Sequence, residues 1–208
     1  MYDPISTLAA IDRNAVTVIG LCIGALIFNY CYFGEAIRLG FRHRTYSVPA
    51  SVTLIFLPHD VSYLLEYEKW FVQYDHWFCK LWWVGLIFTA AIEAVFYYQL
   101  IRYGREEILP QLSQKAYTLV MVLALAVGAG AWQTVKQALN DDLYLFSFGW
   151  TLFWGSPLCI SMMVRRGSRR GQSSWMWVSY ALMAMFYWAA TAFVDPYFRS
   201  IGWLTVLV

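Results

Sequence analysis

The chain has 208 residues, of which 60% are hydrophobic and 13% are charged, and its mean hydropathy is +0.49. An ordinary globular domain has about 25% charged residues, so this composition excludes a typical soluble domain and indicates an integral membrane protein. The net charge of +2 is too small to indicate nucleic acid as a partner. The cysteines form no C-x-x-C pair and accompany no histidine cluster, so we expect neither a disulfide framework nor a zinc site.

Long apolar runs alternate with short polar loops along the whole chain. A helix needs about 20 residues to cross a bilayer core of about 30 Å, and only helices satisfy the backbone hydrogen bonds of such segments in lipid. We therefore predict an all-α, polytopic transmembrane helix bundle, in one domain covering residues 1–208. The last apolar run, 201–208, is too short to cross and predicts a partial seventh span. The six full spans are predicted at residues 15–37, 47–67, 77–101, 116–136, 143–164 and 174–194.

Basic residues predict the orientation of the bundle. The loops after the first, third and fifth spans carry ten of the fifteen lysines and arginines, and the positive-inside rule assigns such loops to the cytoplasm. The N-terminus is then outside. We expect a multi-pass protein of a bacterial plasma membrane or of the endoplasmic reticulum. The ten residues are Arg38, Arg42, Arg44, Arg102, Arg105, Lys115, Arg165, Arg166, Arg169 and Arg170.

Ionisable side chains interrupt the predicted spans at membrane depth, where a charge costs several kcal/mol and usually marks a functional site. Asp60 follows His59 and Pro58 in the second span, and Glu93 is near the middle of the third. Burial favours the protonated form of a carboxyl, which suits a general acid. We therefore predict catalytic roles for Asp60, Glu93 and His59. The alternative is that these acids are buried hydrogen-bonding groups that hold helices together.

Aromatic residues make up 19% of the chain, more than the two interfacial belts of a membrane protein require. Packing is the default role of such side chains. An aromatic-walled pocket is the alternative, because ring faces stabilise cations, and an acid among aromatic rings suits carbocation chemistry. The aromatic residues predicted to bind substrate are Tyr63, Tyr97, Trp132, Trp150, Trp154, Tyr187 and Trp188.

The loop "RRGSRRGQSSWMWVS", residues 165–179, resembles the signature R-G-S-S/T-R-G-A-S-x-x-x-W-V/L-S of the membrane-bound terpene cyclases of fungal meroterpenoid and indole-diterpene pathways. "RTY" at residues 44–46 and "FNY" at residues 28–30, which contains Asn29, are similar to further motifs of that family. The resemblance covers about residues 20–200. It implies six spans, an N-terminus outside, and cyclisation started by protonating an epoxide or alkene of a membrane-dissolved prenyl chain.

Counting from "RTY", the family's proton-donating glutamate falls on Asp60, and the tryptophan before it falls on His59. The family's other acid is an aspartate in the seventh span, for which Asp195 is the candidate substitute here. The resemblance thus assigns Asn29 and Asp195 to substrate binding. The chain has no aspartate-rich D-D-x-x-D motif, so we expect no metal and no cofactor. The expected partners are a lipophilic prenylated substrate and membrane lipid.

Two other functions fit the same acids. Glu35, Glu93 and Asp60 form a ladder across the predicted bundle, which suits a small-solute transporter or channel with an acidic path. A membrane enzyme of another chemistry, such as an isomerase acting on a lipid, is the third possibility. The loop motif favours the cyclase, although membership of a family does not fix the reaction.

Overall fold

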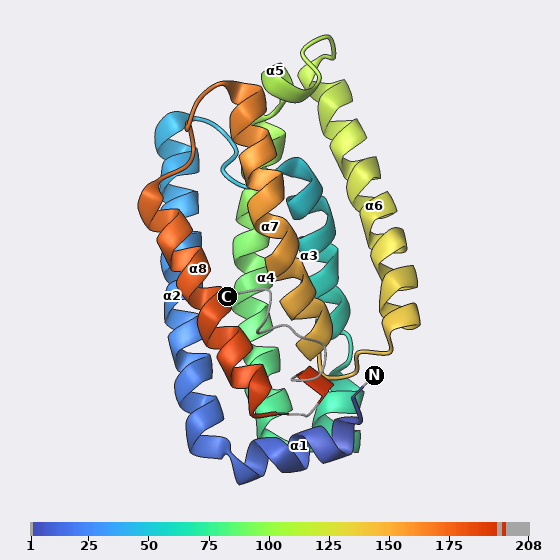
Figure 1. Ribbon diagram of the computed structural model, residues 1–208. Coiled ribbons are helices and arrows are strands. Elements are labelled where there is room, and N and C mark those ends of the chain that lie inside the picture. The colour runs from blue at the N-terminus through green and yellow to red at the C-terminus, as the bar shows by residue number, and fades with distance from the viewer. Residues whose placement is uncertain (1, 195–196, 199–208) are drawn as a thin grey trace.

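A computed structural model describes residues 2–194 and 197–198, and within these residues the regular elements are all helical (Figure 1). Asp195 and the predicted partial seventh span, 201–208, lie outside the described residues. The helices are α1 (Pro4–Arg13), α2 (Ala15–His43), α3 (Ala50–Leu64), the π-helix η1 (Lys69–Gln73), α4 (Trp77–Tyr103), α5 (Arg105–Ile108), α6 (Gln114–Leu139), α7 (Leu145–Arg166) and α8 (Ser174–Ala192).

The six long helices run side by side as a bundle, with successive helices pointing in opposite directions (Figure 1). α2 packs along α8, and α3 packs against both α4 and α6. The short helix α1 lies across one end, and α5 lies at the other end (Figure 1). The three arginine-rich loops, which follow α2, α4 and α7, come together at the end occupied by α5.

Three helices, α2, α4 and α6, are long and apolar enough to cross a membrane, by length and composition. They indicate a membrane protein and correspond to the predicted first, third and fourth spans. α3 has 15 residues, fewer than the predicted 47–67 and fewer than a span needs. α7 has 22 residues and α8 has 19, but among the described helices only α2, α4 and α6 are also apolar enough to cross, so the structure supports three of the six predicted spans.

The helix α1 was not predicted, although the sequence contains a signal for it. The side chain of Asp3 accepts a hydrogen bond from the backbone N–H of Ser6 at 2.8 Å, and Pro4 begins the helix. An aspartate N-cap followed by proline at the first helical position is a typical helix start. Trp77 of α4 donates to the Asp12 carboxylate at 2.8 Å, which fastens α1 to the bundle.

Pro58, inside α3, shapes the contact between α3 and α6. Proline has no N–H, so it leaves the carbonyl of Leu54, one turn earlier, without its helical donor. That carbonyl oxygen lies so close to Gly128 of α6 that a Cβ on residue 128 would be 2.2 Å from it. The glycine therefore lets the two backbones approach each other, as small residues do between membrane helices.

Substituting Gly128→Ala is expected to destabilise the protein by about 1–3 kcal/mol, the typical cost of overpacking. The control is Gly130→Ala on the same helix, where an added Cβ meets nothing within 4 Å. That change should be neutral or stabilise by up to about 1 kcal/mol, because alanine favours helix more than glycine does. Denaturant unfolding in detergent measures both free energies, and equal values for the two variants would contradict the close approach.

Candidate functional site

A cavity of about 640 Å³ lies between α2 and α4 and extends to Asp60 of α3 and Tyr144 before α7. Its volume is typical of a small-molecule site. Its wall is mainly aliphatic and aromatic, and a polar group consisting of Asn29, Asp60, Thr89 and Tyr144 forms one part of it. The aromatic side chains on the wall are Tyr30, Trp77, Phe78, Trp82, Phe88, Tyr144 and Phe148.

The cavity opens sideways between α2 and α4. Ile23 of α2, and Leu81 and Phe88 of α4, line the cavity, yet 51%, 63% and 58% of their surfaces are exposed. Residues that are both cavity wall and outer surface mark an opening in the side of the bundle. The two helices that flank the opening, α2 and α4, are both long and apolar enough to span a membrane.

Asp60 is buried and held by three side chains from different parts of the chain. The Thr89 hydroxyl of α4 lies 2.6 Å from Asp60 Oδ2, and the Tyr144 hydroxyl donates to Asp60 Oδ1. His59 Nδ1 lies 2.9 Å from the same Oδ1 and 3.0 Å from the Tyr144 hydroxyl. These contacts fix the direction of the carboxyl, and Asp60 still borders the large cavity.

The Thr89 hydroxyl has two possible hydrogen-bond partners. Thr89 Oγ1 is within hydrogen-bonding distance of the Leu86 carbonyl oxygen, at 3.2 Å, as well as of Asp60 Oδ2. A hydroxyl has one proton and two lone pairs, so Thr89 can donate to Leu86 while it accepts from a protonated Asp60. The Thr89 hydroxyl can therefore be either a donor to the Asp60 carboxyl group or an acceptor from it.

A second cavity, of about 50 Å³, also borders Asp60. Asn29, Asp60, Thr89 and Tyr144 border both cavities, whereas Glu93 and His59 border only the small one. The two acids predicted from the sequence thus face one common space. Tyr32, Phe33, Phe56 and Phe96 complete much of its aromatic wall.

The predicted catalytic residues and Asn29 are brought together, but none of the seven predicted aromatic residues lines either of these two cavities. Trp132 and Tyr63 lie behind His59, with ring centroids 4.4 Å and 5.8 Å from the imidazole. The Trp132 indole donates to Ser62 Oγ at 2.9 Å. These two rings therefore support the position of His59 and do not face the large cavity.

The other predicted aromatic residues pack elsewhere in the bundle or face outward. Tyr187 is buried in the core, where its ring packs 4.7 Å from that of Phe148. Trp188 lies against Gly149 of α7, and Tyr97 packs into a separate cluster near the arginine-rich end. Trp150 and Trp154 are on the outer face of α7, with 39% and 43% of their surfaces exposed, so the structure does not bring them to the site.

Thr89, Trp82, Phe148 and Tyr144 border the large cavity but were not predicted as site residues. Tyr144 is the clearest case. It lies in the loop between α6 and α7 with a positive φ of 67°, a conformation that is uncommon for a bulky residue. The loop is fixed by buried Asp141, which accepts from the backbone N–H of Ser147 at 2.6 Å and from the Tyr2 hydroxyl. No periodic pattern in the sequence indicates this inward turn.

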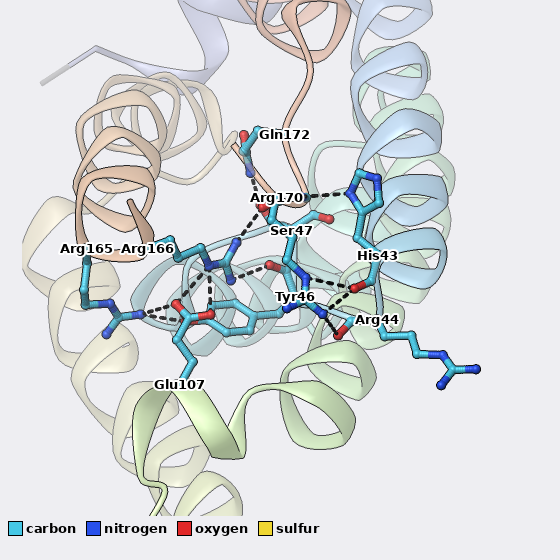
Figure 2. Close-up of polar contacts among 10 residues, drawn as sticks. His43, Arg44, Tyr46, Ser47, Glu107, Arg165, Arg166, Arg170 and Gln172 are labelled. Carbon is cyan, nitrogen blue, oxygen red and sulfur yellow. Dashed lines mark hydrogen bonds and ion pairs between the residues drawn. The ribbon is translucent and has the colours of Figure 1, made fainter. Parts of the chain in front are cut away.

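The two loop motifs meet at the opposite end of the bundle from α1, in a group we name the arginine clamp: Tyr46, Glu107, Arg165, Arg166 and Arg170 (Figure 2). The Glu107 carboxylate accepts from Arg165 at 2.9 Å and from Arg166 at 2.8 Å. The Tyr46 hydroxyl donates to Glu107 at 2.6 Å. Burial, with this hydrogen bond, raises the pKa of Tyr46 to about 12, so Tyr46 stays a donor at neutral pH.

The rest of the clamp connects the loop after α7 to the loop after α2. Arg166 donates to the Tyr46 carbonyl at 2.9 Å, and Arg170 donates to the His43 carbonyl at 2.6 Å (Figure 2). The backbone N–H of Gly171 donates to His43 Nδ1 at 3.1 Å. In this structure the signature residues therefore hold helix ends together, far from the Asp60 cavity.

The chemistry available at Asp60 comes from carboxyl, imidazole and hydroxyl groups beside an apolar cavity. Within the described part of the chain, no three His, Cys, Asp or Glu side chains come close enough together to hold a metal ion. The resemblance to membrane-bound terpene cyclases rests on the sequence motifs alone. No protein-family model matches this chain, and neither a curated protein nor a solved structure matches it significantly.

Proposed function

We propose that this protein is an integral membrane terpene cyclase that starts cyclisation by protonating a prenyl or epoxy-prenyl chain. The observation that carries the proposal is the position of Asp60, a buried acid on the wall of a 640 Å³ apolar cavity that opens sideways. A lipophilic chain would enter between α2 and α4. Asp60 would then protonate its terminal alkene or epoxide, with no diphosphate leaving group and no cofactor.

Aromatic side chains near Asp60 support the later steps. Protonation creates a carbocation, and ring faces stabilise cations by about 0.5–2 kcal/mol each. Trp82 and Phe148 border the cavity together with Asp60, and their ring centroids lie 5.6 Å apart. A folded prenyl chain would pass these rings as its positive charge moves. His59 orients Asp60, and Glu93, which borders only the small cavity beside Asp60, serves as a second acid or, through that cavity, as the base that takes the final proton.

The proposal includes the topology predicted from the sequence. All six long helices would cross the membrane, with the arginine clamp in the cytoplasm and the N-terminus outside, as the positive-inside rule requires. The short α3 would lie inside the bundle between α4 and α6, where lipid contact is limited. The host membrane would be a bacterial plasma membrane or the endoplasmic reticulum.

A transporter with an acidic path has less support. Glu35, one member of the predicted ladder, accepts from Arg38 at 2.7 Å and from Ser173 at 2.9 Å. It borders neither cavity that contains Asp60. Asp60 and Glu93 therefore face one common space. Glu35 instead accepts hydrogen bonds from Arg38 and from Ser173, the N-cap residue of α8.

The test is to give membranes containing the protein a set of prenylated aromatic compounds and their terminal epoxides. Cyclisation by proton transfer is an isomerisation, so the expected product has the mass of the substrate and fewer double bonds or no epoxide. Chromatography with mass spectrometry and NMR identifies it. Solute flux in proteoliposomes, with no cyclised product from any prenylated compound, would contradict the proposal and favour the transporter.

Tyr144→Phe is expected to lower the cyclisation rate by about tenfold, the effect of losing one strong hydrogen bond to the acid. The ring and the cavity wall remain, and only the hydroxyl that contacts Asp60 and His59 is lost. The matched control is Tyr67→Phe, because Tyr67 is 52% exposed and lies outside both cavities. Equal rates for wild type and Tyr144→Phe would remove the hydroxyl from the mechanism.

A further inference from the structure

The small cavity beside Asp60 is lined by buried polar atoms that have no hydrogen-bond partner among the described residues. Three side chains on its wall, Thr53, His59 and Glu93, have at most 6% of their surfaces exposed. Among the described residues, Thr53 Oγ1, His59 Nε2 and Glu93 Oε2 have no hydrogen-bond partner. Leaving a buried polar group unpaired costs about 1–3 kcal/mol, so three such groups around one cavity indicate a shared polar ligand.

The size of the cavity defines that ligand. A water molecule takes up about 30 Å³ of liquid, so a cavity of about 50 Å³ has room for one or two water molecules, whereas the large cavity has about 640 Å³. Buried waters typically make about three hydrogen bonds to groups that would otherwise be unpaired. Thr53, His59 and Glu93 provide that number, and Asp60 borders the same space.

We propose that this cavity is a water-filled relay chamber through which Glu93 returns a proton to Asp60 after each cyclisation, an inference that rests on the proposed function. When Asp60 protonates the prenyl chain, its O–H bond breaks, a C–H bond forms, and Asp60 becomes a carboxylate. Glu93 then gives a proton to a chamber water, which gives a proton to Asp60. The proton lost by the final carbocation returns to Glu93 through water, so no proton is consumed overall.

His59 is a positioning residue in this scheme. With its Nδ1 proton donated to Asp60 Oδ1, 2.9 Å away, its Nε2 is an acceptor available to a chamber water. Trp132, 4.4 Å from the imidazole, and Tyr63 restrict the orientation of the ring. His59 Nε2 would thus accept a hydrogen bond from a water close to Asp60. Thr53, which precedes His59 in α3, would bind the same water through its hydroxyl.

The relay predicts that Glu93→Gln separates the first turnover from the later ones. In this scheme Asp60 gives its proton to the substrate before Glu93 acts, so consumption of the prenyl substrate in the first turnover should stay within about twofold of wild type. Steady-state turnover should fall by about 100-fold, since reprotonation loses its acid. Thr53→Val should lower only the steady-state rate, by about fivefold, because it removes one hydrogen bond to water without changing the side-chain shape.

The matched control is Ser179→Ala, which removes a buried, unpartnered hydroxyl that borders neither cavity. Both rates should stay at the wild-type level. Denaturant unfolding verifies that each variant is folded. A folded Glu93→Gln with wild-type steady-state turnover would overturn the relay, and so would an equal loss of the first and later turnovers.

A second measurement separates failure of the relay from failure of the proposed function. If wild type cyclises no prenylated compound, the proposed function fails, and infrared spectroscopy then tests the chamber by itself. The carboxyl band that disappears in Glu93→Gln should shift in Asp60→Asn, because chamber water connects the two acids. Thr53→Leu, which fills the chamber, should abolish that shift. A Glu93 band that does not respond to Asp60→Asn would overturn the inference.

Discussion

Asp60→Asn is expected to lower the cyclisation rate by about two to four orders of magnitude, the typical contribution of a general acid. Asparagine has nearly the size of aspartate and can still hydrogen-bond to Thr89 and Tyr144, so the cavity should keep its shape. It has no proton acidic enough to give to an alkene or epoxide. The measurement is the initial rate of product formation in membranes that contain equal amounts of each variant.

Two further variants test whether the loss of activity is specific to the acid at position 60. Asp75→Asn makes the same chemical change at an exposed aspartate paired with Lys80, and it should leave the rate unchanged. Asp60→Glu keeps an acid in the cavity and should retain more activity than Asp60→Asn. An Asp60→Asn protein that folds and cyclises at the wild-type rate would exclude Asp60 as the proton donor.

Glu107→Gln should destabilise the protein by about 3 kcal/mol, the lower part of the range for breaking a buried ion pair. The Arg166 side chain is only 4% exposed, whereas the Glu107 side chain is 26% exposed, which is why we expect the lower value. Without the carboxylate, the buried guanidinium keeps neutral acceptors such as the Tyr46 carbonyl. The free energy of unfolding in detergent, from denaturant titration, measures the change.

The neighbouring residue is a matched control for this prediction. The Glu106 side chain is 86% exposed and lies 3.3 Å from Arg105. Exposed ion pairs contribute about 0–1 kcal/mol, so Glu106→Gln should have a small effect on unfolding. If the two variants were destabilised equally, the arginine clamp would not be the feature that fixes this end of the bundle.

Apolar length predicted the long helices well. The apolar runs at 77–101 and 174–194 correspond to the helices α4 at Trp77–Tyr103 and α8 at Ser174–Ala192, although of the described helices only α2, α4 and α6 are long and apolar enough to cross a membrane. Such agreement is expected because lipid and protein interior both force an apolar segment to satisfy its own backbone hydrogen bonds. The second span was predicted longer than α3, because the apolar pattern continues past Leu64 while the backbone changes to a turn and then to η1.

The direction of each side chain could not be predicted in the same way. In a membrane helix, both the face toward lipid and the face toward the core are apolar, so hydrophobic periodicity carries little information. Trp150 and Trp154 therefore looked equivalent to Trp132 in the sequence, although they face outward and Trp132 is buried. Polar residues escape this ambiguity, since lipid excludes them from the outer face.

The sequence by itself thus determined that the chain is helical and apolar, and it predicted Asp60, His59 and Glu93 as site residues. It could do so because burying a charge in an apolar run costs enough to need a functional or structural reason. Only the tertiary structure decided that Asp60 and Glu93 share one space, that Thr89 and Tyr144 hold the acid, and that α2 and α4 leave a lateral opening. Those features depend on contacts between segments as far apart as Asp60 and Tyr144, which no local pattern records.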